Sequence, residues 1–179
     1  MTDLSGKKIA IIATDWFEEA ELVTPRDELG EAGAEVRVYS DDTDPIQAVQ
    51  GDTDATRKVD VDGAFGDLDV SSVDAVVVPG GTVNADRLRV DEDAQSIVRR
   101  ALAADKVVAV ICHGPWLLVN AGVADGRSLT SFHTLEADLR NAGANWKDEE
   151  VVVDGTLITS RSPDDLPAFV EAISEALAE

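Results

Sequence analysis

The stretch that decides the fold is Lys106-Val-Val-Ala-Val-Ile-Cys112-His-Gly-Pro115-Trp-Leu-Leu. Residues 106–111 form a short run rich in β-branched side chains, which is typical of a strand buried on both faces. A helix is expected after Pro115, because proline fits a first helical turn, where its missing N–H costs no hydrogen bond. Cys112 is therefore expected at a strand-to-helix turn, where the ligand crevice of an open α/β sheet lies.

This position gives Cys112 a possible chemical role. A helix that begins just after the cysteine points free N–H groups and a positive dipole end at the sulfur, which favours the thiolate. The backbone N–H of His113 could then stabilise an oxyanion, as in the nucleophile turn of hydrolases. The alternative is an inert buried cysteine followed by a helix-capping histidine. The turn position, the adjacent histidine and the Gly-Pro pair together favour a nucleophile.

The rest of the chain alternates strands with helices. Apolar runs predict strands at 8–13, 35–40, 73–78 and 106–111, and helical patterns are expected at 18–32, 91–104, 116–121, 135–142 and from 163 or 164 to the end. A weak edge strand or hairpin arm is expected at 57–61, and a hairpin is expected to join 151–153 to 157–159 through Asp154-Gly155. This order is typical of a mostly parallel sheet with helices on both faces, in one doubly wound domain over 1–179.

Charge and composition exclude several classes of partner. The 36 acidic residues against 15 basic ones give a net charge of −21, which would repel nucleic acid and anionic membranes. So acidic a surface favours a high-salt cytoplasm, the alternative being an ordinary acidic protein. The sequence has no run of 18 apolar residues and no signal-peptide core, so we expect a cytoplasmic protein without a membrane span.

Cofactor and metal signals are missing from the sequence. The single cysteine excludes an internal disulfide and a multi-cysteine zinc site. Neither G-x-G-x-x-G after the first strand nor G-x-x-x-x-G-K-[ST] occurs. We therefore expect no metal and no cofactor.

Two other predicted loops should converge on Cys112, because the carboxyl ends of parallel strands share one crevice. The loop at 14–21 carries Glu18 and Glu21, three residues apart at a helix start and so on one face. A carboxyl beside a thiolate has a raised pKa and can donate a hydrogen bond to sulfur. Alternatively, such acids simply complement the helix dipole.

The loop at 79–86 offers backbone and acidic groups. The N–H groups of Gly80 and Gly81 could approach a substrate oxygen, the alternative being a tight turn that needs positive φ. Asp86 could orient the imidazole of His113, as a third group does in cysteine–histidine sites, or be a solvated surface acid. We expect the other histidine, His133, to be a surface residue.

These residues resemble the ThiJ/PfpI family, and within it the PfpI-type intracellular cysteine proteases. The matching pieces lie in the family's order along nearly the whole chain, and the Cys-His-Gly-Pro turn after an apolar strand is the most specific of them. They are Phe17-Glu-Glu-Ala-Glu-Leu22, Val78-Pro-Gly-Gly81, Val110-Ile-Cys-His-Gly-Pro115, Asn141-Ala-Gly143, Val151-Val-Val-Asp-Gly155 and Thr159-Ser-Arg161.

The resemblance implies a flavodoxin-like α/β fold related to class I glutamine amidotransferases. It implies a nucleophile at Cys112 with its neighbour His113. The family's acid on the first helix, hydrogen-bonded to the cysteine, corresponds best to Glu21, with Glu18 close by.

The resemblance also implies a homo-oligomer, a dimer or a trimer of dimers. In such oligomers a neighbouring subunit contributes the third triad acid from the position of Asp86, where the family often has glutamate. Many members carry a tyrosine near the site where this chain has Phe132, so a hydroxyl that could bind substrate is missing.

We therefore predict a cysteine enzyme that acts on small carbonyl or peptide substrates. Two chemistries remain open: peptide hydrolysis through an acyl-enzyme, and glyoxalase or protein deglycase activity through a hemithioacetal. The alternative class is a non-enzymatic stress protein that senses oxidation at Cys112 or acts as a chaperone. A flavin-binding domain is less favoured, because Cys112 would then have no role.

Overall fold

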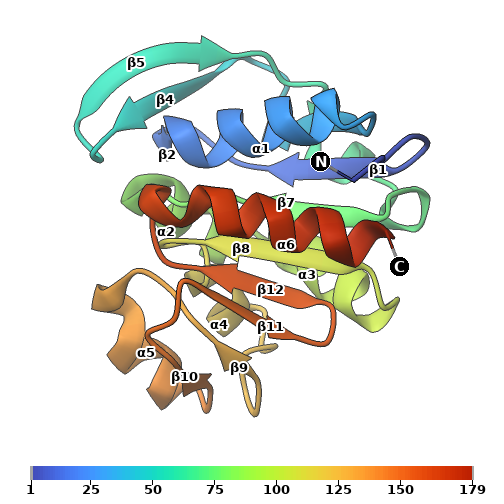
Figure 1. Cartoon of the computed structure of the whole chain (residues 1–179). Coiled ribbons are helices and arrows are strands. Elements are labelled where there is room, and N and C mark those ends of the chain that lie inside the picture. Colours follow the sequence, from blue (N-terminus) through green and yellow to red (C-terminus); the bar gives the residue numbers. More distant parts are fainter. Residues whose placement is uncertain (1, 179) are drawn as a thin grey trace.

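The computed structural model describes residues 2–178 and is built on one large mixed sheet (Figure 1). The sheet has seven strands in the order β11-β12-β8-β7-β1-β3-β6, and only the β11–β12 pair is antiparallel. The strands are β1 (Lys8–Ile12), β3 (Glu35–Ser40), β6 (Gly63–Ala64), β7 (Ala75–Val78), β8 (Val107–Ile111), β11 (Val151–Asp154) and β12 (Leu157–Ser160). The prediction of a mostly parallel α/β sheet is confirmed.

Helices cover both faces of the sheet. In Figure 1, α1 (Glu19–Glu31) and α6 (Leu166–Ala178) lie in front of the strands, and α3 (Glu92–Ala103) and α4 (Trp116–Asn120) lie behind them. The remaining helices are α2 (Thr82–Val90) and α5 (Glu136–Asn141), and short 3-10 helices occupy Phe65–Asp67, Val70–Ser72, His133–Leu135 and Pro163–Asp165. None of the helices within residues 2–178 has the length and apolar character needed to cross a membrane.

The packing of strand β8 explains why its sequence is continuously apolar. All five of its residues are buried. Val108 and Val110 belong to the core under α3 and α4, whereas Val107, Ala109 and Ile111 belong to the core under α1 and α6. Because successive side chains of a strand point to opposite faces, a strand between two helical layers needs apolar residues at every position.

The segment 41–72 differs most from the prediction. There β4 (Ile46–Gln50) and β5 (Asp54–Val59) form a hairpin that pairs with β2 (Phe17–Glu18) in a second sheet. The weak strand expected at 57–61 overlaps β5. The β4–β5 hairpin extends beyond the edge of the main sheet (Figure 1), and its tip is formed by Gly51 and Asp52, both with positive φ. A third, short sheet pairs β9 (Ser128–Leu129) with β10 (Asn145–Trp146).

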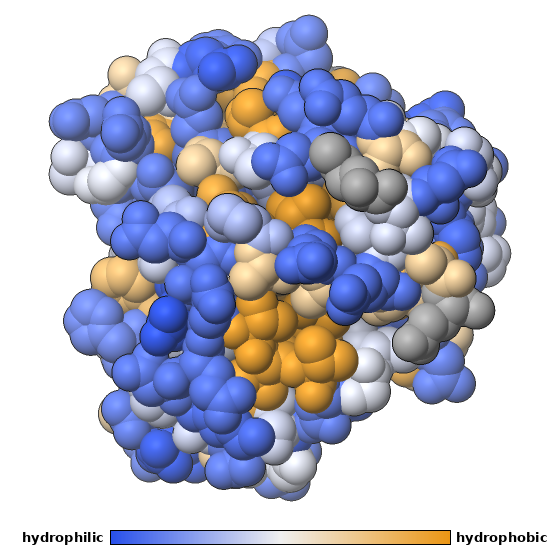
Figure 2. All heavy atoms as spheres, in the orientation of Figure 1, coloured by the Kyte–Doolittle hydropathy of each residue, from blue (hydrophilic) through white to orange (hydrophobic). Residues whose placement is uncertain are grey.

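Two helix predictions also need correction. The charged stretch 84–89, for which no helix was predicted, lies within the nine-residue helix α2. The last helix begins at Leu166, after a 3-10 turn at Pro163–Asp165. Polar side chains dominate the face drawn in Figure 2, with apolar atoms exposed only in separate patches, as the acidic composition leads one to expect.

One buried side chain, Asn84 of α2, ties together the ends of β1 and β7. Its Oδ1 accepts hydrogen bonds from the backbone N–H (2.7 Å) and the hydroxyl (3.2 Å) of Thr14. Its Nδ2 donates to the carbonyl oxygens of Pro79 (3.1 Å) and Gly80 (2.9 Å). Asn84 therefore fixes the turn after β7 relative to the loop after β1.

Replacing Asn84 by alanine should destabilise the fold. The change leaves buried backbone groups without partners, at a cost of roughly 1–3 kcal/mol for each, so the free energy of unfolding should fall by about 3 kcal/mol in urea denaturation. The matched control is Asn120→Ala at an exposed position of α4, which should change stability by less than about 0.5 kcal/mol. Equal stabilities of the two variants would contradict this role for Asn84.

Candidate active site

Cys112 lies at the sharp turn that follows β8. Its φ of +63° is in the left-handed region, which residues other than glycine rarely adopt. Backbone hydrogen bonds hold it there: its N–H donates to the carbonyl of Ser160 on β12 (3.1 Å), and its carbonyl accepts from the N–H of Phe132 (2.8 Å). Such strain persists only where the surroundings over-determine it, and it is commonest at functional sites.

The neighbouring histidine contacts the sulfur. The Sγ of Cys112 lies 3.3 Å from the Nδ1 of His113. The imidazole stacks on the ring of Phe132, with centroids 4.7 Å apart, and meets the ring of Trp116 edge-on at 5.7 Å. Phe132, predicted as a substrate-binding position that lacks the hydroxyl of many relatives, therefore packs directly on the imidazole of the Cys–His pair.

Glu21 reaches the same point from the first turn of α1. Its side chain is fully buried beside the Cys112 thiol, and its Oε2 accepts a hydrogen bond from the N–H of Gly80 at 2.7 Å. A Cβ at position 80 would lie 2.6 Å from that oxygen and 2.7 Å from the Cβ of Cys112. Only glycine at position 80 lets the carboxyl, the turn and the cysteine meet.

This contact corrects the expectation for the two glycines. The N–H of Gly80 is already bonded to Glu21, so it is not free to bind a substrate oxygen. The N–H groups of Gly81 and His113 instead favour negative charge on the sulfur of Cys112. These two donors are the ones available to an oxyanion formed near Cys112.

Burial strongly affects the carboxyl of Glu21. It raises the pKa of Glu21 from 4.5 to about 8, against the opposing influence of the Gly80 N–H and the Cys112 thiol. Within residues 2–178, Oε1 of Glu21 has no hydrogen-bond partner of standard geometry. An acceptor-only carboxylate is costly in such a place, so the protonated acid is the form that fits at neutral pH.

The sulfur experiences opposing influences. Burial raises the pKa of Cys112, and an ionised Glu21 would raise it further, while the N–H groups of His113 and Gly81 lower it. The influence of Glu21 changes sign once its carboxyl is protonated, since the acid can then donate to sulfur instead of repelling it. The predicted preference for the thiolate is contradicted, because burial and an ionised Glu21 raise the pKa of Cys112 more than the N–H groups of His113 and Gly81 lower it. Helix α4 begins only at Trp116.

His113 is placed to accept the thiol proton. Burial lowers the pKa of its imidazole, with Asp52 opposing this shift, so the neutral ring is favoured. A neutral imidazole whose Nδ1 faces the sulfur can act as a general base. The geometry therefore supplies a nucleophile, a base, a buried acid and two backbone donors.

The other two predicted acids lie outside this cluster. Oε2 of Glu18 accepts from the N–H of Gly51 at 2.9 Å, so this side chain faces the β4–β5 hairpin. Burial raises the pKa of Glu18. Asp86 is exposed on α2 and forms an ion pair with Arg89 at 2.7 Å. Within its own chain Asp86 does not orient His113.

Sequence reasoning missed two residues on the far side of the imidazole. The hydroxyl of Thr82 lies 3.4 Å from Nε2 of His113. Asp52, at the hairpin tip, accepts from the N–H of Thr82 at 2.7 Å and from its hydroxyl at 2.9 Å. In so acidic a chain, Asp52 could not be distinguished from the other acids by sequence pattern. Asp52 and Thr82 are also 30 positions apart, so their contact gives no local sequence signal. His133 is exposed beside Phe132, as expected.

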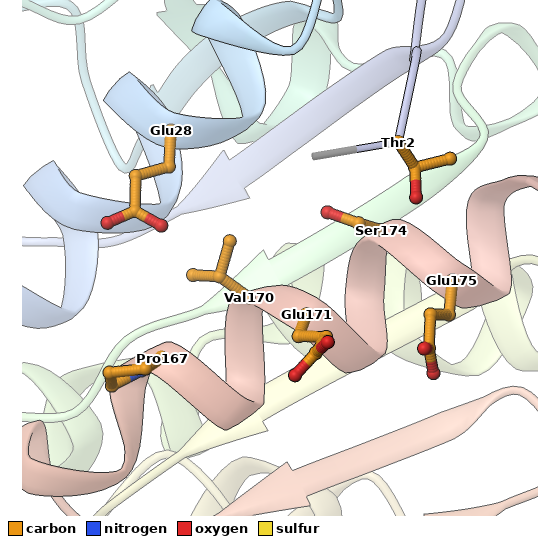
Figure 3. Close-up of a pocket in the computed structure, with 7 residues that line it drawn as sticks. All are labelled: Thr2, Glu28, Pro167, Val170, Glu171, Ser174 and Glu175. Atoms are coloured by element: carbon orange, nitrogen blue, oxygen red, sulfur yellow. The ribbon is translucent and has the colours of Figure 1, made fainter.

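A cavity between α1 and α6 lies away from this chemistry. Its volume is about 520 Å³, it is lined by Glu28, Glu171, Glu175 and apolar and small side chains (Figure 3), and it shares no residue with the Cys112 cluster. Within residues 2–178, no group of three or more His, Cys, Asp or Glu side chains is arranged to hold a metal ion.

The comparisons with known proteins agree with this geometry. Residues 7–176 match the model of the DJ-1/PfpI family. The chain belongs to this family. It is 41% identical over 170 residues to Deglycase TK1284 of Thermococcus kodakarensis, covering 95% of this chain and 99% of the relative. YraA of Bacillus subtilis, which bears a provisional cysteine-protease name, is 40% identical over 164 residues, with coverage of 92% and 94%.

A solved structure has the same fold. A two-domain protein of Anabaena variabilis with DJ-1/ThiJ/PfpI-like and ferritin-like domains matches with a TM-score of 0.89 and 36% identity. The match covers 96% of this chain and 48% of that protein. The resemblance drawn from the motifs is therefore confirmed, and the names of the relatives support an enzyme of this family.

The raised pKa of Glu21 should appear in the stability of the fold. Between pH 4.5 and about pH 8 the folded chain holds a proton that the unfolded chain releases, so the contribution of Glu21 to stability falls as pH rises through this window. Glu21→Gln has no such proton. The difference between its melting temperature and that of the wild type should therefore increase steadily, in favour of the variant, from about pH 5 to pH 8.

The matched control is Glu31→Gln, at the exposed end of the same helix, whose melting curve should follow that of the wild type at every pH. Parallel pH profiles for Glu21→Gln and the wild type would show that Glu21 does not retain its proton on folding.

Proposed function

We propose that this protein is a cytoplasmic cysteine enzyme of the glyoxalase or deglycase type, which attacks the carbonyl carbon of small dicarbonyls such as methylglyoxal. The observation that carries the proposal is the 3.3 Å contact between the Cys112 sulfur and Nδ1 of His113 at a strained turn. A nucleophile within hydrogen-bond reach of a base is the arrangement that covalent catalysis on carbonyls requires.

The proposed first step forms a bond between the sulfur of Cys112 and the aldehyde carbon of the substrate. His113 Nδ1 takes the thiol proton while the sulfur of Cys112 bonds to the aldehyde carbon, and the carbonyl π electrons move to oxygen. The N–H groups of His113 and Gly81 stabilise that oxygen as it becomes negative, which is the role of an oxyanion hole. The imidazolium then returns the proton to the oxygen, giving a hemithioacetal.

The exposure of the sulfur favours small substrates. Cys112 is only 6% exposed, so an extended peptide would need the surrounding loops to open before its carbonyl reached Sγ. A small aldehyde needs far less room. Peptide hydrolysis remains the second candidate, supported by the provisional cysteine-protease name of the relative YraA.

The proposal includes a homo-oligomer. Asp86 is exposed and paired with Arg89 in its own chain, so it could join a triad only from a neighbouring copy. The three acids then have separate roles: Glu21 beside the sulfur, Glu18 at the hairpin, and Asp86 at the surface where copies would meet.

Removing the sulfur tests the proposed function. Cys112→Ala and Cys112→Ser should consume methylglyoxal no faster than buffer, while the exposed-site control Asn120→Ala keeps the wild-type rate. Full turnover by Cys112→Ala would overturn the proposal. If the wild type turns over neither methylglyoxal nor peptides but Cys112 selectively gains two oxygens in mild peroxide, the redox-sensor alternative is favoured instead.

A further inference from the structure

The far side of the His113 ring is occupied by a hydroxyl–carboxyl pair. Thr82 Oγ1 lies between Nε2 of His113 (3.4 Å) and Oδ2 of Asp52 (2.9 Å). Asp52 also accepts from the backbone N–H of Thr82 at 2.7 Å, so both carboxylate oxygens are directed at one residue. The chain of contacts therefore runs from Cys112 through His113 and Thr82 to Asp52.

The hairpin holds Asp52 at a conformational cost. Asp52 has a φ of +66°, a conformation that aspartate tolerates better than most residues but that still costs free energy. It is half-buried, unlike the exposed Thr53 and Asp54 that follow it. The tip of the hairpin is thus shaped to bring one carboxylate to the first residue of α2.

Counting protons gives the direction of each hydrogen bond. A threonine hydroxyl has a single proton, and a carboxylate can only accept. The hydroxyl of Thr82 therefore gives its proton to Asp52 and can only accept from the imidazole. Nε2 of His113 must then carry the ring proton, and in the neutral ring Nδ1 is left with its lone pair facing the sulfur at 3.3 Å.

We propose that Asp52 and Thr82 are positioning residues that select the tautomer of His113 in which Nδ1 is free to accept the proton of Cys112. The claim about the tautomer stands on geometry alone, and its catalytic consequence rests on the function proposed above. It gives His113 an orienting contact from its own chain, which Asp86 does not make.

Nitrogen NMR of the wild-type protein tests the tautomer without any turnover. In protein labelled with ¹⁵N-histidine, one-bond and long-range proton–nitrogen spectra distinguish a protonated ring nitrogen from a bare one. The chain has two histidines, so His133→Gln assigns the signals of His113. We expect a protonated Nε2 and a bare Nδ1. A protonated Nδ1 in the neutral ring would overturn the proposal.

Variants test whether Asp52 and Thr82 select this tautomer. In Asp52→Asn the new amide can donate to Thr82 and release its hydroxyl proton toward Nε2, so His113 should shift toward the Nδ1–H form. Thr82→Val removes the acceptor and should leave a mixture of tautomers, whereas Thr82→Ser should preserve the wild-type signals. Asp54→Asn, an exposed acid on the same hairpin, is the charge-matched control and should change nothing.

Reactivity should follow the tautomer. General-base assistance is worth roughly 10²–10⁴-fold, so the rate of Cys112 alkylation by iodoacetamide should fall about tenfold or more in Asp52→Asn and Thr82→Val. In turnover, kcat should fall with little change in KM. Unchanged tautomer and alkylation rate in both variants would overturn the proposal. If the tautomer and the alkylation rates behave as expected but the wild type does not turn over methylglyoxal, the proposed function fails while the tautomer assignment stands.

Discussion

The structure of the site depends on a buried carboxyl, that of Glu21, held where three chain segments meet. The first turn of α1 supplies the acid, the turn after β7 supplies the Gly80 N–H, and the turn after β8 supplies the sulfur of Cys112. Burial makes the charged form of this carboxyl costly and raises its pKa to about 8. A proton held here turns a group that would repel a thiolate into one that can stabilise it.

The surrounding fold is rigid enough to impose this arrangement. The strands that end at the site are buried between two helical layers, so their carboxyl ends cannot shift independently. Asn84 connects the loops after β1 and β7. The strained backbone of Cys112 is held by hydrogen bonds to Ser160 and Phe132 on other segments. Rigid elements of this kind hold reacting groups at productive distances before substrate arrives.

Sequence reasoning succeeded where one physical pattern dominates. Strands buried on both faces leave continuous apolar runs, which is why β1, β7 and β8 and the turn at Cys112 were all predicted. It found only part of the β4–β5 hairpin, the weak strand at 57–61 that overlaps β5, since five of the six residues of β5 are exposed. Glu18 and Glu21 could not be separated by spacing, because only the packing of α1 shows which faces the sulfur. Asp52 and Thr82 meet through tertiary structure alone.

The central claim, that Glu21 keeps its proton beside Cys112 at neutral pH, is tested most directly by infrared spectroscopy. The difference spectrum between the wild type and Glu21→Gln isolates the carbonyl stretch of this one carboxyl. The account predicts the band of a protonated carboxylic acid at pH 6, disappearing as pH rises through about 8. A difference spectrum that shows only an ionised carboxylate at pH 6 would contradict it.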